Sequence, residues 1–228
     1  MTDGVAKAKR AAAVAAANLV ESGMRVGLGT GSTFAFVIDR LAERKKAEDL
    51  SFVGVPTSTQ TAELATAAGL QLAELDDLDE LDLAIDGADE VDPRKNLIKG
   101  GGGAHLRERI VAATARELVV IVDEHKLVDV LGQRFLLPVE VVPLGWRHAA
   151  KRLRATDCEP KRRERDGQPF VTDNGNYVLD CKYDGIPDPA ALATTLDGTV
   201  GVVDHGLFVG MAGRVIIGDE AGSVRVIE

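Results

Sequence analysis

The sequence predicts an α/β protein with a Rossmann-like, mostly parallel sheet flanked by helices, and a smaller inserted α+β domain of ferredoxin-like type. Short, nearly all-apolar runs at 81–85 and 118–122 are typical of strands buried on both faces of a parallel sheet. Segments with helical periodicity alternate with such runs. After Gly132 the pattern changes to hairpin-like strands separated by turn residues, which indicates a second, antiparallel unit.

The first domain is expected to span residues 1–131. Its first helix is Ala-rich and is expected to end at Ser22-Gly23, because glycine favours the end of a helix. The expected helices are 5–21, 33–47, 58–68 and about 105–117. The expected strands are 24–29, 51–55, 71–75, 81–85 and 118–122. Together they give the alternating order that builds a parallel sheet.

The smaller domain is expected to span residues 132–205, and residues 206–228 are expected to return to the first domain. The Asp-Asn-Gly-Asn turn at 173–176 indicates a hairpin. The expected strands of the smaller domain are 136–142, about 159–165, 170–172, 177–183 and 200–204, with helices at 146–155 and 189–196. The last strands are expected at 207–211, 215–218 and 224–227.

Composition narrows the class of protein. The chain has 228 residues, of which 45% are apolar, and no run of 18 apolar residues, so a membrane span is not expected. The N-terminus lacks a charged-then-apolar signal pattern, which favours a cytoplasmic enzyme. The net charge of −9 argues against a nucleic-acid partner. The one basic cluster, Lys161-Arg162-Arg163 with Arg165, is interpreted as a solvated strand or hairpin.

The two cysteines, Cys158 and Cys181, show no metal-ligand spacing and are interpreted as plain strand residues. The four histidines form no metal-binding pattern, so no zinc site is expected.

A glycine-rich segment, Gly27-Leu28-Gly29-Thr30-Gly31-Ser32-Thr33, joins a predicted strand to a predicted helix. Glycines allow close approach of the backbone, and the start of a helix offers free N–H groups that suit a phosphate. The dinucleotide pattern G-x-G-x-x-G fails because its third glycine falls on Ser32, and no Gly-Lys-Ser/Thr follows. The segment therefore predicts a phosphate or sugar-phosphate site, although a tight turn with a helix cap explains it too.

Acidic residues and glycines come together in two neighbouring segments. Asp86-Gly87-Ala88-Asp89-Glu90 follows a buried strand, and Lys99 precedes four glycines at 100–103. The alternative is that Asp89, Glu90 and Asp92 solvate a loop and cap a helix, and two carboxylates without a third ligand do not make a magnesium site. The next helix carries Glu108 in its first turn, where a carboxylate also stabilises the helix. Acids, a lysine and bare backbone together predict proton transfer on a small anionic substrate.

Five motifs then occur in the order of one family. They are Gly-Leu-Gly-Thr-Gly-Ser-Thr, Asp-Gly-Ala-Asp-Glu, Lys-Gly-Gly-Gly-Gly with Glu nine residues after the lysine, Asp-Glu-His-Lys and Thr-Asp-Asn-Gly-Asn. The chain resembles ribose-5-phosphate isomerase A from Lys9 to its end. The resemblance implies interconversion of D-ribose 5-phosphate and D-ribulose 5-phosphate through an enediol in the pentose phosphate pathway, without metal or cofactor. It also implies a homodimer or homotetramer.

The resemblance implies roles for individual residues. Glu108 would be the base, and Asp86, Asp89 and Lys99 would form the polar catalytic cluster, with Asp86 serving ring opening and proton movement between O1 and O2. Lys99 and the amides of Gly100, Gly101 and Gly102 would stabilise the oxyanion. The remaining substrate-binding residues would be Lys9, Thr30, Gly31, Ser32, Thr33, Gly87, Ala88 and Lys126.

One departure from the family pattern is His105-Leu106-Arg107 before Glu108, where an apolar and a small polar residue are expected. His105 either packs in the interior or is solvated, or it faces the cleft and tunes the base. Two other functions remain open: a non-catalytic sugar-phosphate sensor, and an amino-sugar phosphate deaminase or lactonase-like enzyme with His105 or His125 as its histidine.

Overall fold

A computed structural model describes residues 3–228, which form two compact units. The first unit contains the described residues up to Ala88, residues 107–126 and residues 211–228. The second contains residues 89–106 and 127–210. The chain passes from one unit to the other inside the Asp-Gly-Ala-Asp-Glu motif, between Ala88 and Asp89. No helix within residues 3–228 is long and apolar enough to cross a membrane.

The first unit is built on a six-stranded sheet with the strand order β15-β14-β6-β3-β1-β2. All neighbouring strands pair in parallel except β14 and β15, which are antiparallel. The strands are β1 (Arg25–Leu28), β2 (Val53–Pro56), β3 (Leu83–Gly87), β6 (Leu118–Asp123), β14 (Ala212–Gly218) and β15 (Val224–Ile227). β6 is buried along its whole length, as its all-apolar sequence predicts. The mostly parallel sheet confirms the predicted fold class.

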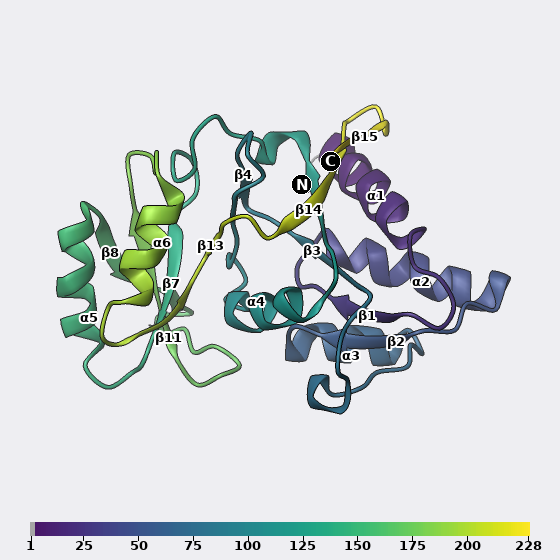
Figure 1. The fold of residues 1–228 in the computed structure, drawn as a ribbon, viewed down its shortest axis with the longest axis horizontal. Coiled ribbons are helices and arrows are strands. Elements are labelled where there is room, and N and C mark those ends of the chain that lie inside the picture. Colours follow the sequence, from purple (N-terminus) through teal and green to yellow (C-terminus); the bar gives the residue numbers. More distant parts are fainter. Residues whose placement is uncertain (1–2) are drawn as a thin grey trace. The chain divides into compact units, whose positions relative to one another are not determined.

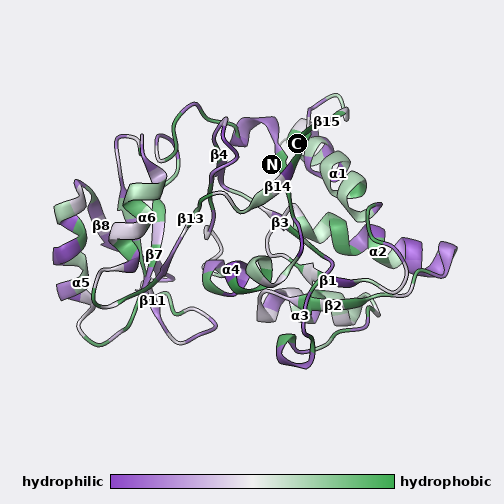
Figure 2. Ribbon diagram, viewed as in Figure 1, coloured by the Kyte–Doolittle hydropathy of each residue, from purple (hydrophilic) through white to green (hydrophobic). Residues whose placement is uncertain are grey.

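Four helices accompany this sheet: α1 (Asp3–Ala17), α2 (Phe34–Glu48), α3 (Thr59–Ala67) and α4 (His105–Thr114). Helix α1 packs beside the C-terminal strands β14 and β15, which are yellow beside the purple helix in Figure 1. A Cβ atom at Gly218 would lie 2.0 Å from the carbonyl oxygen of Ala8, so only glycine permits this approach. Helix α2 buries Phe34 and Leu41 in its first half, whereas its C-terminal end is hydrophilic (Figure 2).

The second unit holds a four-stranded antiparallel sheet in the order β12-β7-β11-β8. Its strands are β7 (Leu137–Val141), β8 (Glu159–Arg162), β11 (Tyr177–Lys182) and β12 (Val202–His205). Helix α5 (Trp146–Leu153) contacts β8, and α6 (Pro189–Asp197) contacts β12 (Figure 1). A small sheet joins β13 (Leu207–Phe208), β5 (Leu97–Ile98) and β4 (Glu90–Val91), and β9 (Glu164–Arg165) pairs with β10 (Gln168–Pro169). This unit has the predicted α+β character.

Some predicted elements differ in the structure. The first helix ends at Ala17 rather than near residue 21, and the predicted strand 71–75 is reduced to one bridge between Gly54 and Leu72. Strands β4 and β5 were not predicted, because two-residue strands are too short to show a periodic pattern. Since they pair with each other and with β13, residues 89–106 belong to the second compact unit, whereas the sequence placed them in the domain 1–131.

Candidate active site

The loop from Gly29 to Thr33 connects β1 to helix α2 in the first unit. The Oγ1 atom of Thr30 lies 2.8 Å from the hydroxyls of Thr57 and Ser58 and 3.1 Å from that of Thr61. Thr61 also donates to the carbonyl oxygen of Gly29 at 2.8 Å. These hydrogen bonds fix the loop at the N-terminus of a 15-residue helix, where N–H groups and the helix dipole attract anions.

The hydroxyl cluster of Thr57, Ser58 and Thr61 was missed in the sequence. Its signal was present: Thr57 and Ser58 directly follow β2, the parallel neighbour of β1. Because carboxyl ends of parallel strands meet at one edge of a sheet, polar residues after 53–56 belong beside the 29–33 loop. Ser58 also caps helix α3, since its Oγ atom accepts a hydrogen bond from Thr61 N at 3.1 Å.

The two predicted phosphate lysines lie in the first unit. Lys9, on helix α1, donates from Nζ to Ser32 Oγ at 3.0 Å, so its charge reaches the 29–33 loop. Lys126 is half-buried in the single helical turn Glu124–Lys126 after β6. Because β6 and β3 are neighbouring strands, Lys126 and Asp86 both lie near the edge of the sheet where these strands end.

Asp86 is 3% exposed near the end of β3 and is bound to the 29–33 loop. Its Oδ1 atom accepts hydrogen bonds from Thr30 N at 3.1 Å and from Gly87 N at 2.7 Å. A Cβ atom at Gly29 would lie 2.3 Å from Asp86 Oδ1, which explains the glycine at this position. The structure therefore joins the first predicted carboxylate to the predicted phosphate loop.

Glu108 stands in the first turn of helix α4 and is 5% exposed. The helix packs tightly on β1, because a Cβ atom at Gly27 would lie 2.5 Å from Val111 Cγ1. A buried carboxylate in the first turn is stabilised by the helix dipole. Its burial also keeps the carboxylate away from bulk water.

Asp89, Lys99 and the glycine loop (Gly100–Gly103) lie in the second unit. Asp89 Oδ2 accepts a hydrogen bond from Gly101 N at 2.8 Å. Lys99 is 3% exposed, and its Nζ atom lies 5.4 Å from the centre of the Phe208 ring, a cation–π contact. The structure thus joins Asp89 to the glycine loop.

The sequence leaves open that Glu90 solvates a loop, but in the structure this residue is buried. It is 1% exposed, and its carboxylate accepts hydrogen bonds from the backbone N–H groups of Gly132 (2.6 Å), Arg134 (2.8 Å) and Phe135 (2.7 Å). The last acid of the Asp-Gly-Ala-Asp-Glu motif therefore organises the segment 132–135.

His105 is fully buried, which excludes a solvated position. Its Nε2 atom lies 3.8 Å from Oε2 of Glu140, on β7. Glu140 Oε1 accepts hydrogen bonds from Thr172 Oγ1 and Asn176 Nδ2, both at 2.9 Å. The Thr-Asp-Asn-Gly-Asn motif thus serves to hold a buried carboxylate.

The basic cluster is not simply solvated, contrary to its interpretation from the sequence. The side chain of Arg163 is 15% exposed, and its Nη1 atom donates to the carbonyl oxygens of Gly100 and Gly101, both at 3.0 Å. No signal in the sequence marks this contact, because Arg163 lies more than sixty residues away from the glycines.

Within residues 3–228, no group of three or more His, Cys, Asp and Glu side chains is arranged to hold a metal ion. Both cysteines are buried and free. Cys181 lies on β11, whereas Cys158 directly precedes β8.

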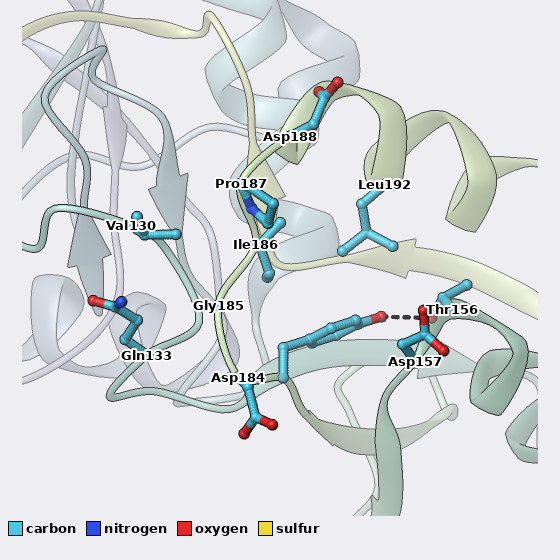
Figure 3. Close-up of a pocket in the computed structure, with 11 residues that line it drawn as sticks. Val130, Gln133, Thr156, Asp157, Asp184, Gly185, Ile186, Pro187, Asp188 and Leu192 are labelled. Atoms are coloured by element: carbon cyan, nitrogen blue, oxygen red, sulfur yellow. Dashed lines mark hydrogen bonds between the residues drawn. The ribbon is translucent and has the colours of Figure 1, made fainter.

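A cavity of about 670 Å³ lies in the second unit (Figure 3). Its lining includes the apolar side chains Val130, Ile186 and Leu192 and the carboxylates of Asp184 and Asp188. None of the predicted site residues lines it.

Comparisons with known proteins agree with the family resemblance that the motifs indicate. The family model described as ribose 5-phosphate isomerase A (phosphoriboisomerase A) matches residues 53–222. A ribose-5-phosphate isomerase A of Synechococcus sp. (strain JA-3-3Ab) is 54% identical over 216 residues, which are 94% of either chain. The corresponding protein of Thermomicrobium roseum is 51% identical and covers 99% of this chain and 95% of its own.

Solved structures agree with the sequence relatives. A D-ribose-5-phosphate isomerase in complex with phospho-erythronic acid superposes with a TM-score of 0.93 at 41% identity, covering 96% of this chain and 97% of its own. The ribose 5-phosphate isomerase of Plasmodium falciparum gives a TM-score of 0.94 at 36% identity and covers 100% of this chain and 99% of its own.

Proposed function

Because the chain belongs to the ribose-5-phosphate isomerase A family and is an aldose–ketose isomerase of ribose 5-phosphate, we propose that it works by metal-independent proton transfer through an enediolate. The observation that carries this mechanism is the hydrogen bond from Thr30 N to Asp86 Oδ1. It fixes an acid–base group to the loop that suits the phosphate. Substrate recognition and chemistry are thereby linked through one carboxylate.

In this proposal, the phosphate binds at the loop 30–33, where α2 begins, with the charges of Lys9 and Lys126. The N–H groups at the helix start and the hydroxyls of Ser32 and Thr33 supply donors. Lys9 supports this role through its 3.0 Å hydrogen bond to Ser32. Anchoring the phosphate fixes the sugar at a distance from the reacting carbons, which reduces the entropy cost of reaching the transition state.

Glu108 is the proposed base. Its carboxylate removes the proton from C2 of the open-chain aldose, and the electron pair forms the C1–C2 double bond as O1 becomes an oxyanion. The same carboxyl group returns the proton to C1, which leaves the carbonyl at C2. Asp86 opens the ring and moves the hydroxyl proton from O2 to O1. Its carboxylate is oriented for this task by the backbone N–H groups of Thr30 and Gly87, which both donate to Oδ1.

Lys99 and the glycine loop are the proposed oxyanion stabilisers. Lys99 is buried, so its charge acts in a medium of low polarity and attracts a developing oxyanion strongly. Asp89 already accepts the N–H of Gly101. We therefore assign the backbone contribution mainly to the amide of Gly102, with Asp89 holding the loop and contacting the sugar. The backbone of Gly87 and Ala88 completes the sugar-binding set.

The phospho-erythronic acid bound by one relative is consistent with this chemistry. A phosphorylated aldonic acid carries a planar, negatively charged carboxylate at the end of a sugar chain. Such a group resembles the planar enediolate more than it resembles either neutral sugar, and enzymes bind analogues of the transition state more tightly than substrates.

A coupled assay of ribose 5-phosphate isomerisation with EDTA present tests the proposal. Wild-type protein is expected to turn over, and Glu108→Gln is expected to lower kcat by more than about a hundredfold, since general-base catalysis contributes about 10²–10⁴. Glu124→Gln, an exposed glutamate on the same unit, is the matched control and should be unchanged. Near wild-type turnover by Glu108→Gln would refute the assigned base.

We also propose a homo-oligomer formed through an apolar patch at the edge strand β12. Leu144 is 90% exposed and Val200 is 74% exposed, and Val142 and Val203 are partly exposed beside them. The backbone hydrogen bond from Val142 N to Gly201 O brings the two segments together. Exposed apolar side chains that cluster at an unpaired strand edge indicate a protein interface.

Light scattering after gel filtration tests the oligomer. The expected mass is two or four times the 24.2 kDa chain. Leu144→Lys should shift the mass toward one chain, whereas Val171→Lys, at an exposed apolar position outside the patch, should not. A single-chain mass for the wild-type protein refutes the proposal.

The enzyme is further proposed to act in the cytoplasm, in the pentose phosphate pathway. Its two free cysteines suit a compartment that keeps thiols reduced. Fractionation of the source cells should place the isomerase activity in the cytoplasmic fraction, and activity confined to another compartment would contradict this assignment.

A further inference from the structure

Arg163 joins two parts of the second unit that are far apart in the sequence. Its Nη1 atom donates to the carbonyl oxygens of Gly100 and Gly101, and its Nε and Nη2 atoms donate to the carboxylate of Asp180. We propose that Arg163 is a positioning residue that orients the peptide planes of the glycine loop for the isomerisation. The inference rests on the proposed function, in which the amides of this loop stabilise the oxyanion.

The guanidinium group has a fixed position. Asp180 lies on β11, the strand between β7 and β8, and binds the guanidinium through both oxygens. This two-point pairing defines the plane of the guanidinium. The backbone of Arg163 is held as well, because its N–H donates to Val178 O at 2.8 Å and its carbonyl accepts from Phe170 N at 3.0 Å. Hydrogen bonds therefore hold both the side chain and the backbone of Arg163 in place.

The glycine loop needs such a partner. Glycine loses more conformational freedom on folding than any other residue, and four in succession leave the chain many alternative paths. Gly100 and Gly103 have φ angles of +100° and +81°. A Cβ atom at Gly103 would lie 2.4 Å from the Phe170 ring. The same segment that contributes Arg163 therefore packs against the end of the loop.

The hydrogen bonds of Arg163 fix where the N–H groups point. In a trans peptide, the carbonyl of one residue and the N–H of the next point in opposite directions. The carbonyl of Gly100 is bound by Arg163 and the N–H of Gly101 by Asp89, at 3.0 and 2.8 Å, so this peptide is held from both sides. Arg163 also binds the carbonyl of Gly101, which turns the N–H of Gly102 away from the guanidinium.

Asp89 marks the face of the loop that is opposite to Arg163. Asp89 is also one of the residues assigned to the substrate, so the N–H of Gly102 is turned toward the substrate side of the loop. Without Arg163, the peptide between Gly101 and Gly102 loses the hydrogen bond to its carbonyl oxygen, and the amide of Gly102 no longer meets the oxyanion in a fixed direction. Preorganised donors stabilise developing charge because they need no reorganisation during the reaction.

The test compares Arg163→Met and Arg163→Lys with Arg165→Met. Arg165 is the matched control, because its guanidinium lies 4.8 Å from the centre of the Phe170 ring, as that of Arg163 lies 5.6 Å from it, and it is exposed. Arg163→Met is expected to lower kcat by about 10- to 100-fold, less than the loss of an entire oxyanion donor. KM for ribose 5-phosphate should stay within about threefold, because the phosphate is bound elsewhere.

Inhibition by phospho-erythronic acid provides a readout that a general loss of structure does not produce. Its inhibition constant should rise in parallel with the fall in kcat, because both depend on the oriented amide. Arg163→Lys should be intermediate, since an ammonium group can reach one carbonyl but cannot reproduce the planar fork. Arg165→Met should match the wild type in all three quantities.

The outcomes separate this inference from the proposed function. If the wild type does not isomerise ribose 5-phosphate, or Glu108→Gln remains active, the proposed function fails. If Glu108→Gln is inactive while both Arg163 variants keep wild-type kcat and inhibition, the positioning role is refuted. An equal loss in Arg165→Met also refutes it. Where Arg163→Met does not fold, Arg163→Lys decides, and wild-type kcat in that variant overturns the inference.

Discussion

Replacement of Glu90 by Gln should destabilise the second unit strongly without changing the size of the side chain. The carboxylate is 1% exposed and accepts three backbone hydrogen bonds from the segment 132–135. Oε1 accepts two of them, from Arg134 and Phe135, and Oε2 accepts the third, from Gly132. Each is a charge-assisted bond to a group that is shielded from water.

The magnitude follows from this count. The carbonyl oxygen of Gln can take the place of Oε1 and keep two bonds, which then lack the carboxylate charge. Its NH₂ group must face the N–H of Gly132, so one charge-assisted bond worth about 1.5–3 kcal/mol is lost. The buried N–H of Gly132 is left without an acceptor, which adds about 1–3 kcal/mol. The expected decrease in the free energy of unfolding is the sum of the two contributions, about 2.5–6 kcal/mol.

Urea denaturation, monitored by tryptophan fluorescence, measures this change in the unit that contains Glu90. The single tryptophan, Trp146, begins helix α5 in the same unit as Glu90. With a slope of about 2 kcal/mol per molar urea, the midpoint should fall by about 1–3 M. Glu164→Gln, an exposed position on β9, should stay within about 0.5 kcal/mol of the wild type.

The reasoning is refuted if Glu90→Gln unfolds at the wild-type midpoint. That result would mean that the segment 132–135 finds other acceptors, or water, at no cost. A loss of isomerase activity with unchanged stability would also contradict it, because it would place Glu90 in the chemistry rather than in the architecture.

Three further predictions concern the first unit. Gly29→Ala should destabilise this unit by about 1–3 kcal/mol and lower kcat, because the new Cβ atom would displace the carboxylate of Asp86. Thermal melting measures the stability and the coupled assay measures kcat. An unchanged kcat would contradict the prediction. The side-chain and backbone hydrogen bonds of Arg25 hold the pKa of Asp82 below its ordinary value of 3.8, so the pair stabilises the fold fully above about pH 4 and loses this contribution as the pH falls further. Asp82→Asn should therefore unfold at lower urea than the wild type at pH 7, by less than about 1 kcal/mol, and the difference should shrink below pH 4; a constant difference would refute the assignment. Lys9→Met should raise KM for ribose 5-phosphate more than it lowers kcat, and an unchanged KM would remove Lys9 from the phosphate site.

The fold and the spacing of the motifs could be predicted from the sequence for a common reason. Each depends on residues that are close along the chain. All-apolar runs such as 118–122 predict buried parallel strands, and the glycines of 27–31 predict a tight passage from strand to helix. The distance from Lys99 to Glu108 along the chain is also a local quantity. Such features can be recognised in the sequence because the periodicities of strands and helices are local as well.

Contacts between distant segments were not readable. Arg163 meets the carbonyls of Gly100 and Gly101 across about sixty residues, and Glu90 meets Gly132 across 42. These pairs depend on strand register and on which sheet edge a turn reaches, and many arginines or glutamates would satisfy the same local pattern. From the sequence, Arg163 was therefore interpreted as solvated, and Glu90 was left as a residue that could solvate a loop.

The sequence by itself determined the parallel α/β fold, the glycine-rich passage at 27–33, and the set of acids and glycines that places the chain among its relatives. Only the tertiary structure decided which of those acids do what. Asp86 binds the loop 29–33, Asp89 binds the glycine loop, and Glu90 is enclosed by backbone N–H groups. The physical reason is that a carboxylate is an acceptor for any donor, and its role is fixed by the donors that folding brings to it.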